Sequence, residues 1–309
     1  MRSPRWALAM CCLLIPAFAG GFEAAGQVDA QLYERIEVSS SVVMALHDNG
    51  SNISCVALDD GLVFFDTGLS TRTATAFRHE MEEKFQRPTM ALVLTHAHLD
   101  HLLGMAAFDD VPVYAAQDGR PRWEHFVTIE WDERAIAGYA AVFPTLPDEI
   151  SDAELRLPTD WFSDELVLGS GENDVRIRRT GGHTVDSSSA VVAAGPVVIS
   201  GDLVQARRRP YFGEPDTDFS AWIGALRKWE ELEVEAVCPG HGPVIETAEL
   251  REMRLWFQAA SAAAKRLKDE GATMEDLAAH EDLESGYWPD DGVPPRWWGY
   301  CIKRLYDAS

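Results

Sequence analysis

Short apolar runs in the first part of the chain have the length and composition of β-strands, and one longer segment between them has helical spacing. The predicted strands are residues 41–46, 52–58, 62–65 and 90–94. The helix is predicted over residues 71–85, before the last of these strands. The run at 90–94 is apolar throughout, which is typical of a strand buried on both faces.

The same pattern returns in the second part of the chain. Strands are predicted at residues 175–179, 188–193, 197–200 and 236–238. Helices are predicted at residues 219–232, at 247–269, and from residue 273 onward. Because strands are followed by helices in both parts, the pattern predicts a layered α/β fold and not separate all-β and all-α domains.

Two segments are harder to interpret from the pattern. Residues 115–160 are less regular and rich in aromatic and charged side chains. Two interpretations remain open for them: a helical excursion packed on the core, or a lid or wall of a substrate site. The aromatic, proline-rich stretch at 287–298 is predicted to wrap onto the body of the protein.

The first residues have the features of an export signal. Arg2 and Arg5 provide positive charge, residues 6–18 are mainly apolar, and Ala17-Phe18-Ala19 provides a small-residue cleavage site. The apolar run is too short to span a bilayer comfortably, and no second hydrophobic stretch follows it. We therefore expect residues 1–19 to be a signal peptide. The mature protein is expected to be exported, periplasmic or secreted, without stable membrane insertion.

Composition and charge narrow the function classes. With 309 residues, 46% hydrophobic and 25% charged, the chain suits one large globular domain, with or without an appended piece. The net charge of −23 repels a phosphate backbone, so we expect a small-molecule substrate and no nucleic acid. Signal removal leaves Cys55, Cys238 and Cys301, which permit at most one internal disulfide. The apolar runs around Cys55 and Cys238 predict buried thiols, whereas nothing in the sequence predicts the oligomeric state.

The candidate chemistry begins directly after the strand at 90–94, in Thr95-His96-Ala97-His98-Leu99-Asp100-His101. Three of the nine histidines of the chain lie within six residues here. Side chains alternate along an extended segment, so His96 and His98 lie on one side and can hold one ion together. Asp100 and His101 come as the chain turns into a helix and can face a neighbouring position. Zinc accepts imidazole and carboxylate ligands, and a hydrolytic site keeps one position open for water.

Three further candidates follow predicted strands, and each lies beside glycine. They are His183 in Gly181-Gly182-His183-Thr184, Asp202 in Ser200-Gly201-Asp202, and His241 in Pro239-Gly240-His241-Gly242. Glycine lets the backbone approach closely or adopt unusual dihedral angles next to a ligand. With the His loop these residues make seven candidate ligands, too many for one zinc ion and suited to two that share a carboxylate.

The ordered set His-x-His-x-Asp-His, Gly-His-Thr, Gly-Asp and Pro-Gly-His-Gly resembles the motifs of the metallo-β-lactamase superfamily, over residues 66 to 241. The resemblance implies a four-layer αβ/βα sandwich at 28–250, with two sheets inside and helices outside. A C-terminal helical extension at 251–309 is expected to pack on the same domain. It further implies two metal sites: His96, His98 and His183 for the first ion, Asp100, His101 and His241 for the second, and Asp202 bridging.

The resemblance also implies residues that orient the ligands without binding metal. Asp66 lies in a Phe-Asp-Thr-Gly turn and would orient the His loop, although an aspartate here can also simply cap the turn. Thr184 is expected to support His183 in the same way. The family often continues Gly-His-Thr with Pro-Gly-Ser, whereas this chain has Val185-Asp186-Ser187, which we expect to reshape the pocket floor.

The implied activity is metal-dependent hydrolysis of an ester, thioester, lactone or related bond by a hydroxide bridging two zinc ions. Asp100 and Asp202 are the candidate catalytic residues, and Asp100 or a metal-bound water would return a proton to the leaving group. True β-lactamases of this fold usually carry cysteine or serine in place of Asp202, which disfavours β-lactam hydrolysis without excluding it. Export disfavours the mainly cytosolic substrate of glyoxalase II, and export and acidity together disfavour tRNA processing.

Other classes stay open at this point. Iron is the alternative metal, because persulfide dioxygenases of the same fold hold a single iron with two histidines and an aspartate. A non-catalytic metal-binding or partner-binding protein is the third hypothesis, and the intact ligand set argues against it. The run Arg207-Arg208-Arg209 is either a contact for an anionic substrate or a solvated charge cluster.

Overall fold

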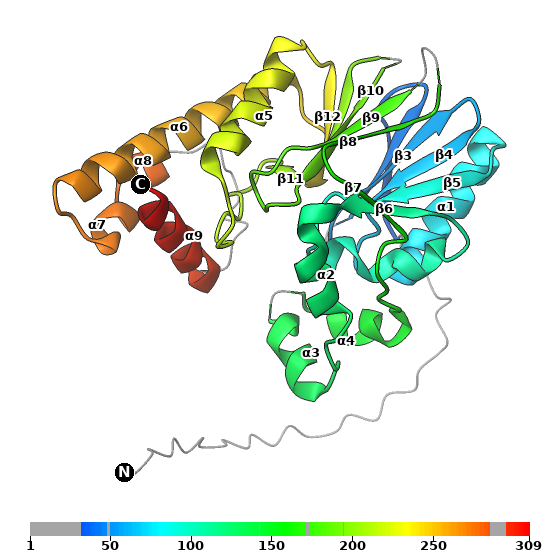
Figure 1. Ribbon diagram of the computed structural model, residues 1–309, viewed down its shortest axis with the longest axis horizontal. Helices are drawn as coiled ribbons and strands as arrows, with labels where there is room; N and C mark the ends of the chain where they lie inside the picture. Colours follow the sequence, from blue (N-terminus) through cyan, green and yellow to red (C-terminus); the bar gives the residue numbers. More distant parts are fainter. Residues whose placement is uncertain (1–31, 48–49, 142, 171–173, 194, 285–294) are drawn as a thin grey trace, which may run out of the picture. The chain divides into compact units, whose positions relative to one another are not determined.

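The computed structural model describes residues 32–47, 50–141, 143–170, 174–193, 195–284 and 295–309 (Figure 1). Leu32–Ser309 form one compact unit. The predicted signal peptide at 1–19 and the predicted wrapping segment at 287–294 lie outside the described residues. Within the described part of the chain, no helix is both long and apolar enough to cross a bilayer.

The first half of the chain forms a seven-stranded sheet whose spatial order follows the sequence. Its strands are β1 (Glu34–Glu37), β2 (Val42–Leu46), β3 (Ile53–Leu58), β4 (Gly61–Phe65), β5 (Thr89–Val93), β6 (Val113–Ala116) and β7 (Asp160–Phe162). β1 to β4 pair antiparallel, whereas β4 to β7 pair parallel. Parallel neighbours need a crossover, and α1 (Thr71–Phe85) supplies the one from β4 to β5.

The second sheet has five strands in the order β12-β11-β10-β9-β8. They are β8 (Glu165–Leu168), β9 (Val175–Arg179), β10 (Ser188–Val192), β11 (Val197–Gln205) and β12 (Ala236–His241). β8 to β11 are antiparallel neighbours, whereas β12 runs parallel to β11. α5 (Phe219–Glu231) makes this last crossover, and Asp218 caps it by accepting from the backbone of Ser220 and Ala221.

The two sheets pack face to face, with helices on their outer faces. Alternation along β4 sends Val63 and Phe65 into the core between the sheets, together with Ile177 and Ile199 of the second sheet. Phe64 points the other way and belongs to the cluster under α1 and the short 3₁₀ segment η2 (Leu103–Phe108). α5 and α6 (Thr247–Asp269) cover the second sheet. This four-layer αβ/βα arrangement confirms the expected fold class (Figure 1).

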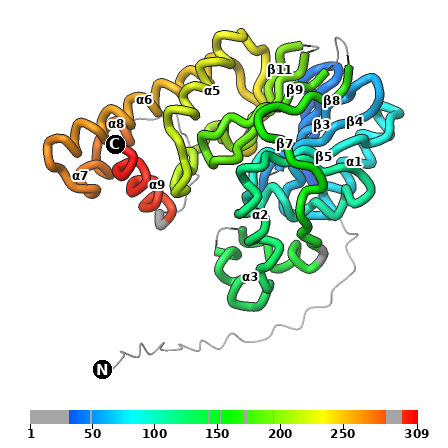
Figure 2. The backbone as a smooth tube through the Cα atoms, viewed as in Figure 1, coloured from blue at the N-terminus to red at the C-terminus, as the bar shows by residue number. Residues whose placement is uncertain are grey.

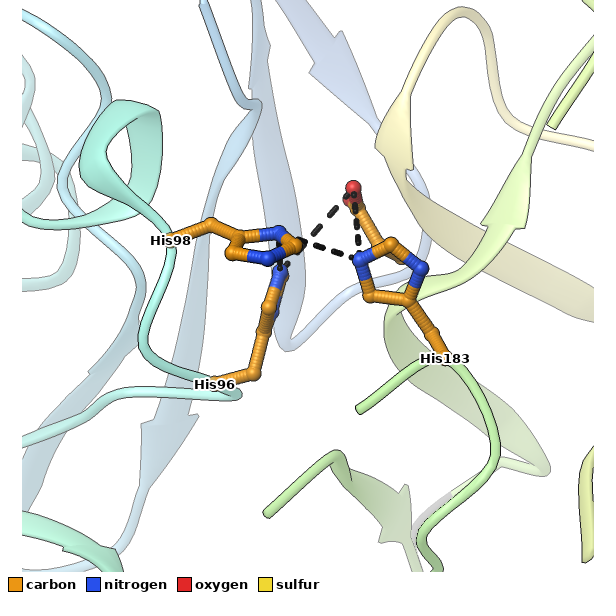
Figure 3. A group of neighbouring side chains, drawn as sticks. His96, His98 and His183 are labelled. Carbon is orange, nitrogen blue, oxygen red and sulfur yellow. Dashed lines mark hydrogen bonds and ion pairs between the residues drawn. The ribbon is translucent and has the colours of Figure 1, made fainter. Parts of the chain in front are cut away.

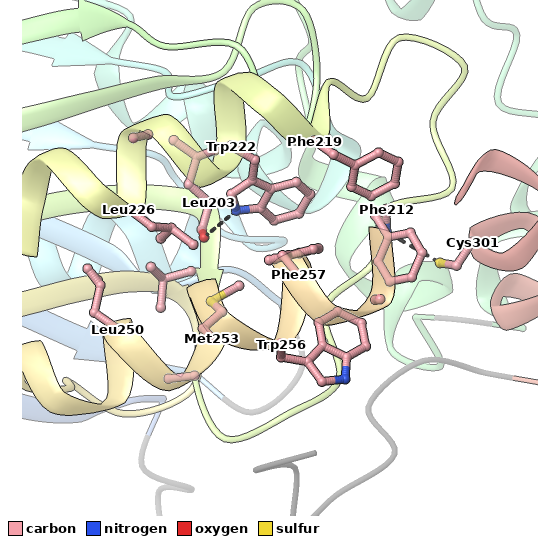
Figure 4. Packing of buried hydrophobic residues seen from close by; sticks show 14 of the residues in the cluster. Leu203, Phe212, Phe219, Trp222, Leu226, Leu250, Met253, Trp256, Phe257 and Cys301 are labelled. Carbon is pink, nitrogen blue, oxygen red and sulfur yellow. Dashed lines mark hydrogen bonds between the residues drawn. The ribbon is translucent and has the colours of Figure 1, made fainter. Parts of the chain in front are cut away.

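The C-terminal helices pack together through one hydrophobic cluster that also includes α5. They are α6, α7 (Met274–Ala278), α8 (Glu281–Glu284) and α9 (Pro295–Ala308), and α9 runs back beside α6 (Figures 1 and 2). Trp222 of α5 packs on Phe257 of α6 with ring centroids 4.6 Å apart, and Cys301 of α9 joins the same cluster (Figure 4). The predicted division at residue 250 therefore falls inside α6, at a residue that is itself buried in this cluster.

The segment between β6 and β7 is helical, in agreement with one part of the expectation for 115–160. It contains η3 (Gln117–Gly119), α2 (Arg120–Phe126), α3 (Glu133–Ala140), α4 (Leu146–Glu149) and η4 (Ile150–Asp152). Trp123 of α2 is fully buried and anchors the segment in the core under the first sheet. α3 has no buried residue and packs more loosely than α2.

Strand boundaries differ from the sequence-based prediction at two kinds of position. The strand predicted to end at residue 200 continues as β11 to Gln205, with all nine residues buried. Gly201 has φ of +51° and the pairing with β12 shifts register there, so Gly-Asp forms a bulge inside a strand and not its end. The short strands β1, β6, β7 and β8 were not predicted. β1, β7 and β8 are partly exposed sheet edges, and β6 has only four residues.

The three cysteines of the described chain, Cys55, Cys238 and Cys301, are buried and unpaired. Burial raises the pKa of the Cys238 thiol to about 12, so this thiol stays protonated and unreactive at neutral pH. The prediction of buried thiols at Cys55 and Cys238 is confirmed, and no disulfide joins the described residues.

The packing of α6 yields a stability prediction with a control on the same helix. Phe257 is 1% exposed, whereas Leu255, two residues earlier, is 48% exposed. We expect Phe257→Ala to lower the free energy of unfolding by about 3–5 kcal/mol, because it leaves a cavity under α5. Leu255→Ala should change it by no more than about 0.5 kcal/mol. Denaturant titration of residues 20–309 measures both, and equal effects would show that α6 is not part of the core.

Candidate metal centre

All seven predicted ligands meet at one end of the two sheets. The His loop follows β5, and its last three residues form the 3₁₀ turn η1 (Leu99–His101). His183 follows β9, Asp202 lies within β11, and His241 is the last residue of β12. They form two neighbouring groups in which the ligand atoms lie within 4.8 Å of one another: His96, His98, His183 and Asp202, and Asp100, His101 and His241.

In the first group three imidazole rings point toward a common centre (Figure 3). His98 Nδ1 is 3.0 Å from His96 Nε2 and 3.1 Å from His183 Nε2. The other ring nitrogens are held by the fold: Thr95 Oγ1 lies 3.1 Å from His96 Nδ1, and the carbonyl of Tyr211 accepts from His183 Nδ1 at 3.0 Å. These contacts leave the inward nitrogens free to act as ligands.

Asp202 lies between the two groups. Its Oδ2 faces the first group, 3.7 Å from His183 Nε2 and 4.0 Å from His96 Nε2. Its Oδ1 faces the second, 3.2 Å from His101 Nε2 and 3.4 Å from His241 Nε2. This geometry is the one that a carboxylate shared by two ions requires.

Glycine makes room for this carboxylate. A Cβ on Gly240 would lie 2.0 Å from Asp202 Oδ1, so β12 can approach β11 here only without a side chain at this position. On the other side, a Cβ on Gly201 would lie 2.5 Å from Thr95 Oγ1. The glycines noted beside the ligands in the sequence thus permit close approach of strands within the site.

The side chains fit metal ions on grounds of their own geometry. His101 Nε2 and Asp202 Oδ1 are buried without a hydrogen-bond partner among the described residues, although they lie 3.2 Å apart. In the first group, three ring nitrogens converge, and each can be donor or acceptor but not both. A cation held between them would satisfy all three at once. The nitrogen and oxygen donors are those of zinc and related metals.

Burial keeps the imidazoles of His96 and His183 neutral. Desolvation, followed by the charges of His101 and His98, holds the pKa of His96 well below its ordinary value. Desolvation and the charge of His98 lower the pKa of His183 to about 4. Neutral imidazole is the form that binds a metal, so these rings need no deprotonation at neutral pH.

The second group has the opposite electrostatics. Burial disfavours a charge on His241, but Asp202 and Asp100 outweigh it and raise the pKa of His241 to about 9. Burial likewise raises the pKa of Asp100, but the charges of His101 and His241 outweigh it and bring this pKa to about 2. A cation held by this group would have to displace the proton that His241 carries at neutral pH.

Asp66 contacts the His loop in the way that the sequence predicts. It ends β4 with φ of +58°, and its Oδ1 accepts from the backbone of Thr95 at 2.8 Å. Its Oδ2 accepts from Thr95 Oγ1 and from His101 Nδ1, both at 2.8 Å. Asp66 therefore fixes the ring of His101 with Nε2 turned inward. Thr184 acts more locally, because its backbone N–H and its hydroxyl both lie 2.9 Å from Ser187 Oγ and close the turn after His183.

Two acidic residues outside the motifs also contact this centre. Glu214 Oε1 lies 3.3 Å from His98 Nε2, the ring nitrogen that points away from the first group. Asp186 is 1% exposed, and its Oδ2 accepts from the backbone of Ala97 at 2.9 Å. Glu214 had no signal in the sequence. Asp186 was noted as a departure from the family pattern, but it lies behind the His loop and not in the cavity wall.

A cavity of about 320 Å³ lies over both groups. Its walls are mainly aromatic and come from several parts of the chain: His98, Leu99, Asp100, Phe126, Tyr139, Phe143, Asp202, Gln205, Arg208, Tyr211, Glu214, His241, Trp297 and Tyr300. The segment 115–160 thus contributes to the wall of the cavity as well as to the core.

The three consecutive arginines have three different surroundings. Arg207 is exposed and pairs with Glu249 at 3.2 Å, as a solvated charge would. Arg208 lines the cavity. The guanidinium of Arg209 lies 4.4 Å from the ring centroid of Trp298. The run is therefore neither one solvated cluster nor one anion site.

Comparison with known proteins agrees with this geometry. The family model described as the metallo-beta-lactamase superfamily matches residues 48–241. The human acyl-coenzyme A thioesterase MBLAC2 is 26% identical over 215 residues, which cover 62% of this chain and 73% of that protein.

Solved structures share the fold at lower identity. A metallo-beta-lactamase from Pontibacter korlensis has a TM-score of 0.55 at 22% identity and covers 73% of this chain and 99% of its own. The sec-alkylsulfatase Pisa1 from Pseudomonas sp. has a TM-score of 0.64 at 18% identity and covers 89% of this chain and 50% of its own. The family match extends over more than half of the sequence and includes every predicted ligand. This chain belongs to the metallo-β-lactamase superfamily.

Proposed function

We propose that this protein is a dinuclear zinc-dependent hydrolase acting on an ester, thioester, lactone or related bond. The observation that carries the proposal is the position of Asp202, with one carboxylate oxygen toward each histidine group. Two ions held close together by a shared carboxylate are typical of metal-dependent hydrolases. The thioesterase name of the human relative supports a thioester or ester among the candidate bonds.

The proposed ligand assignment follows the two groups. The first ion would be held by His96, His98 and His183, and the second by Asp100, His101 and His241, with Asp202 shared. The nitrogen-rich first group and the mixed second group both suit zinc. His98, Asp100, Asp202 and His241 line the cavity, so an ion held by either group would be open to water and substrate.

Bound zinc would supply Lewis acidity and a water molecule that ionises near neutral pH. The protein contributes the orientation of the substrate and the exclusion of bulk water, through the walls of the cavity. Asp100 and Asp202 line the cavity as carboxylates, where they can accept hydrogen bonds from water and from the reacting groups. In the overall reaction, water adds to the carbonyl carbon, the carbon–oxygen or carbon–sulfur bond breaks, and the leaving atom takes the proton.

We also propose that the protein is exported and works in the periplasm or outside the cell. The support is the charged, apolar and small-residue pattern of residues 1–19. An oxidising compartment is compatible with this site, because no cysteine is among the candidate metal ligands. Cys55, Cys238 and Cys301 are all buried.

The first prediction concerns metal content. We expect about two zinc ions per chain in purified residues 20–309, and loss of both metal and activity on chelation. Asp100→Ala should leave about one ion per chain and lower hydrolytic activity by at least about 100-fold, because it removes a ligand from the second group. Elemental mass spectrometry and a panel of thioesters, lactones, esters, phosphodiesters and β-lactams measure these effects.

Asp109→Ala is the matched control, because Asp109 is exposed and outside both groups. It should keep both ions and full activity. About one iron per chain, unchanged by Asp100→Ala, would contradict the dinuclear hydrolase and favour the mononuclear iron oxidoreductase, which oxygen uptake with persulfide substrates then tests.

A second prediction tests export. Expressed with its full sequence in a Gram-negative host, the protein should accumulate in the periplasm with Gly20 as its first residue. Ala19→Leu replaces the small residue at the predicted cleavage position and should block processing. N-terminal sequencing and fractionation give the result, and an unprocessed wild-type chain in the cytoplasm would contradict the proposal.

A further inference from the structure

The cavity over the metal centre has an aromatic wall. The smallest esters, such as acetates, are too short to contact it. The wall consists of Phe126, Tyr139, Phe143, Tyr211, Trp297 and Tyr300. Tyr211 connects it to the metal centre, because its ring centroid lies 5.1 Å from Trp297 and 6.4 Å from His98. The other members come from the segment between β6 and β7 and from α9, which lie far apart in the sequence.

The dimensions of the cavity limit what this wall can hold. Small-molecule sites measure roughly 300–1,000 Å³, so a cavity of about 320 Å³ suits a short to medium-length chain or a single ring. Tyr139 and Trp297 also border a second hollow of about 420 Å³, whose lining includes Asp132 and Arg134. Beyond Tyr139 and Trp297 the aromatic wall therefore gives way to charged side chains.

Resting on the proposed function, we propose that the aromatic wall binds the acyl group of the substrate. The substrate class is then an ester or thioester of a straight acyl chain of about six to ten carbon atoms, or of a single aromatic ring. The carbonyl lies at the floor, beside Asp100 and Asp202, and the acyl chain extends along the wall toward Tyr139 and Trp297. Each methylene that reaches the wall leaves water for an apolar surface.

A series of acyl chain lengths tests the proposal. We expect kcat/KM for p-nitrophenyl esters and for matched thioesters to rise from acetyl to octanoyl, by up to about fourfold per methylene. Beyond about ten carbons it should level off or fall, because the chain then meets the charged lining of the second hollow. Tyr139→Ala and Trp297→Ala should lower the octanoyl-to-acetyl ratio of kcat/KM at least about tenfold.

Leu255→Ala, which truncates an exposed apolar side chain of α6 outside the cavity, is the control and should leave the ratio unchanged. A flat chain-length profile in an active, metal-loaded enzyme would overturn the acyl site and leave the hydrolase intact. Binding separates the two proposals further: octanoate, but not acetate, should raise the Tm of the wild type and not of Trp297→Ala. If octanoate binds in this way but no ester or thioester is cleaved, the proposed function fails and the apolar site remains.

A second inference comes from an independent observation, a single guanidinium that joins three carboxylates. Arg122 of α2 places Nη2 2.9 Å from Asp216 Oδ1 and 3.1 Å from Glu214 Oε2. Its Nη1 lies 3.7 Å from Asp186 Oδ1. α2 begins tightly against this cluster, because a Cβ on Gly119 would lie 2.2 Å from Asp186 Oδ2.

Each of these carboxylates also contacts a loop that carries ligands of the first group. Glu214 contacts the ring of His98, and Asp186 accepts from the backbone of Ala97, between His96 and His98. Asp216 Oδ2 accepts from the backbone of Val185 at 3.2 Å, two residues after His183. Each histidine of the first group, or a backbone group next to it in the same loop, thus contacts one of the three carboxylates that surround Arg122.

We infer that Arg122 is a positioning residue for the first metal ion. Its charge lets three acidic side chains lie together, and they in turn hold the two loops at the spacing that the histidine nitrogens require. The second group is oriented separately, because Asp66 and not this cluster contacts His101. Loss of Arg122 should therefore weaken the binding of the first ion and not of the second.

Metal competition against a chromophoric chelator tests this inference. In Arg122→Met we expect about 10- to 100-fold weaker zinc binding at one site and little change at the other. Asp100→Ala disables the second group, so in the double variant with Arg122→Met the one remaining ion should bind more weakly. Arg122→Lys keeps the charge and should recover part of the affinity. Arg120→Met is the control, because Arg120 lies on the same helix but pairs with the exposed Glu124.

Glu214→Gln tests the same contact without removing the arginine, and it keeps the inference testable if Arg122→Met does not fold. We expect it to weaken binding of the same ion. The double variant with Arg122→Met should be less than additive, because Arg122 acts on His98 through Glu214. Folded Arg122→Met or Glu214→Gln protein that binds both ions with wild-type affinity would overturn the inference. Equally weakened zinc binding at both sites would also overturn it, since a general loss of structure would explain that result.

Discussion

The candidate site depends on one buried carboxylate that faces two groups of histidines. Asp202 is 6% exposed, and such a charge is costly to bury unless cations or protonated partners surround it. His101 and His241 supply the nearest partners on one side, and His96 and His183 lie on the other. The fold holds these rings with their inward nitrogens near one another, an arrangement that favours binding of divalent cations over a metal-free state.

The supporting contacts explain why the rings keep this arrangement. Asp66 holds His101, the carbonyl of Tyr211 holds His183, and Glu214 contacts His98, each at the ring nitrogen that faces away from the centre. Every contact comes from a different part of the chain. The ligand geometry is therefore a property of both sheets and of the loops between them, and not of the His motif alone.

The helical segments outside the sandwich give the centre its surroundings. α2 carries Trp123 into the core, Arg122 toward the acidic cluster and Phe126 into the cavity wall. α9 contributes Cys301 to the core and Trp297 to the wall. The same helices thus stabilise the fold and shape the space in which a substrate would lie. Differences in these helices are a physical route by which one sandwich serves different substrates.

Much of this protein is determined by local sequence patterns. Apolar runs identify most inner strands, and residues 71–85 are a helix as their spacing predicts. The His loop and the three Gly-flanked ligands are recognisable because ligand types and glycines recur at fixed spacing. The prediction failed where tertiary burial decides the outcome: β11 continues through Gly201-Asp202 because both of its faces are covered, although the dipeptide is typical of a turn.

Only the tertiary structure reveals the roles of residues without a motif. Glu214 and Arg122 are ordinary charged residues in the sequence, separated by 92 positions, and they meet because α2 lies against the loop after β11. Trp297 of α9 and Tyr139 of α3 likewise border one cavity, although they lie far apart in the sequence. Ligand types and turns are local properties that sequence determines by itself. Which distant side chains become neighbours depends on how the layers pack, because packing and not spacing along the chain sets distances between segments.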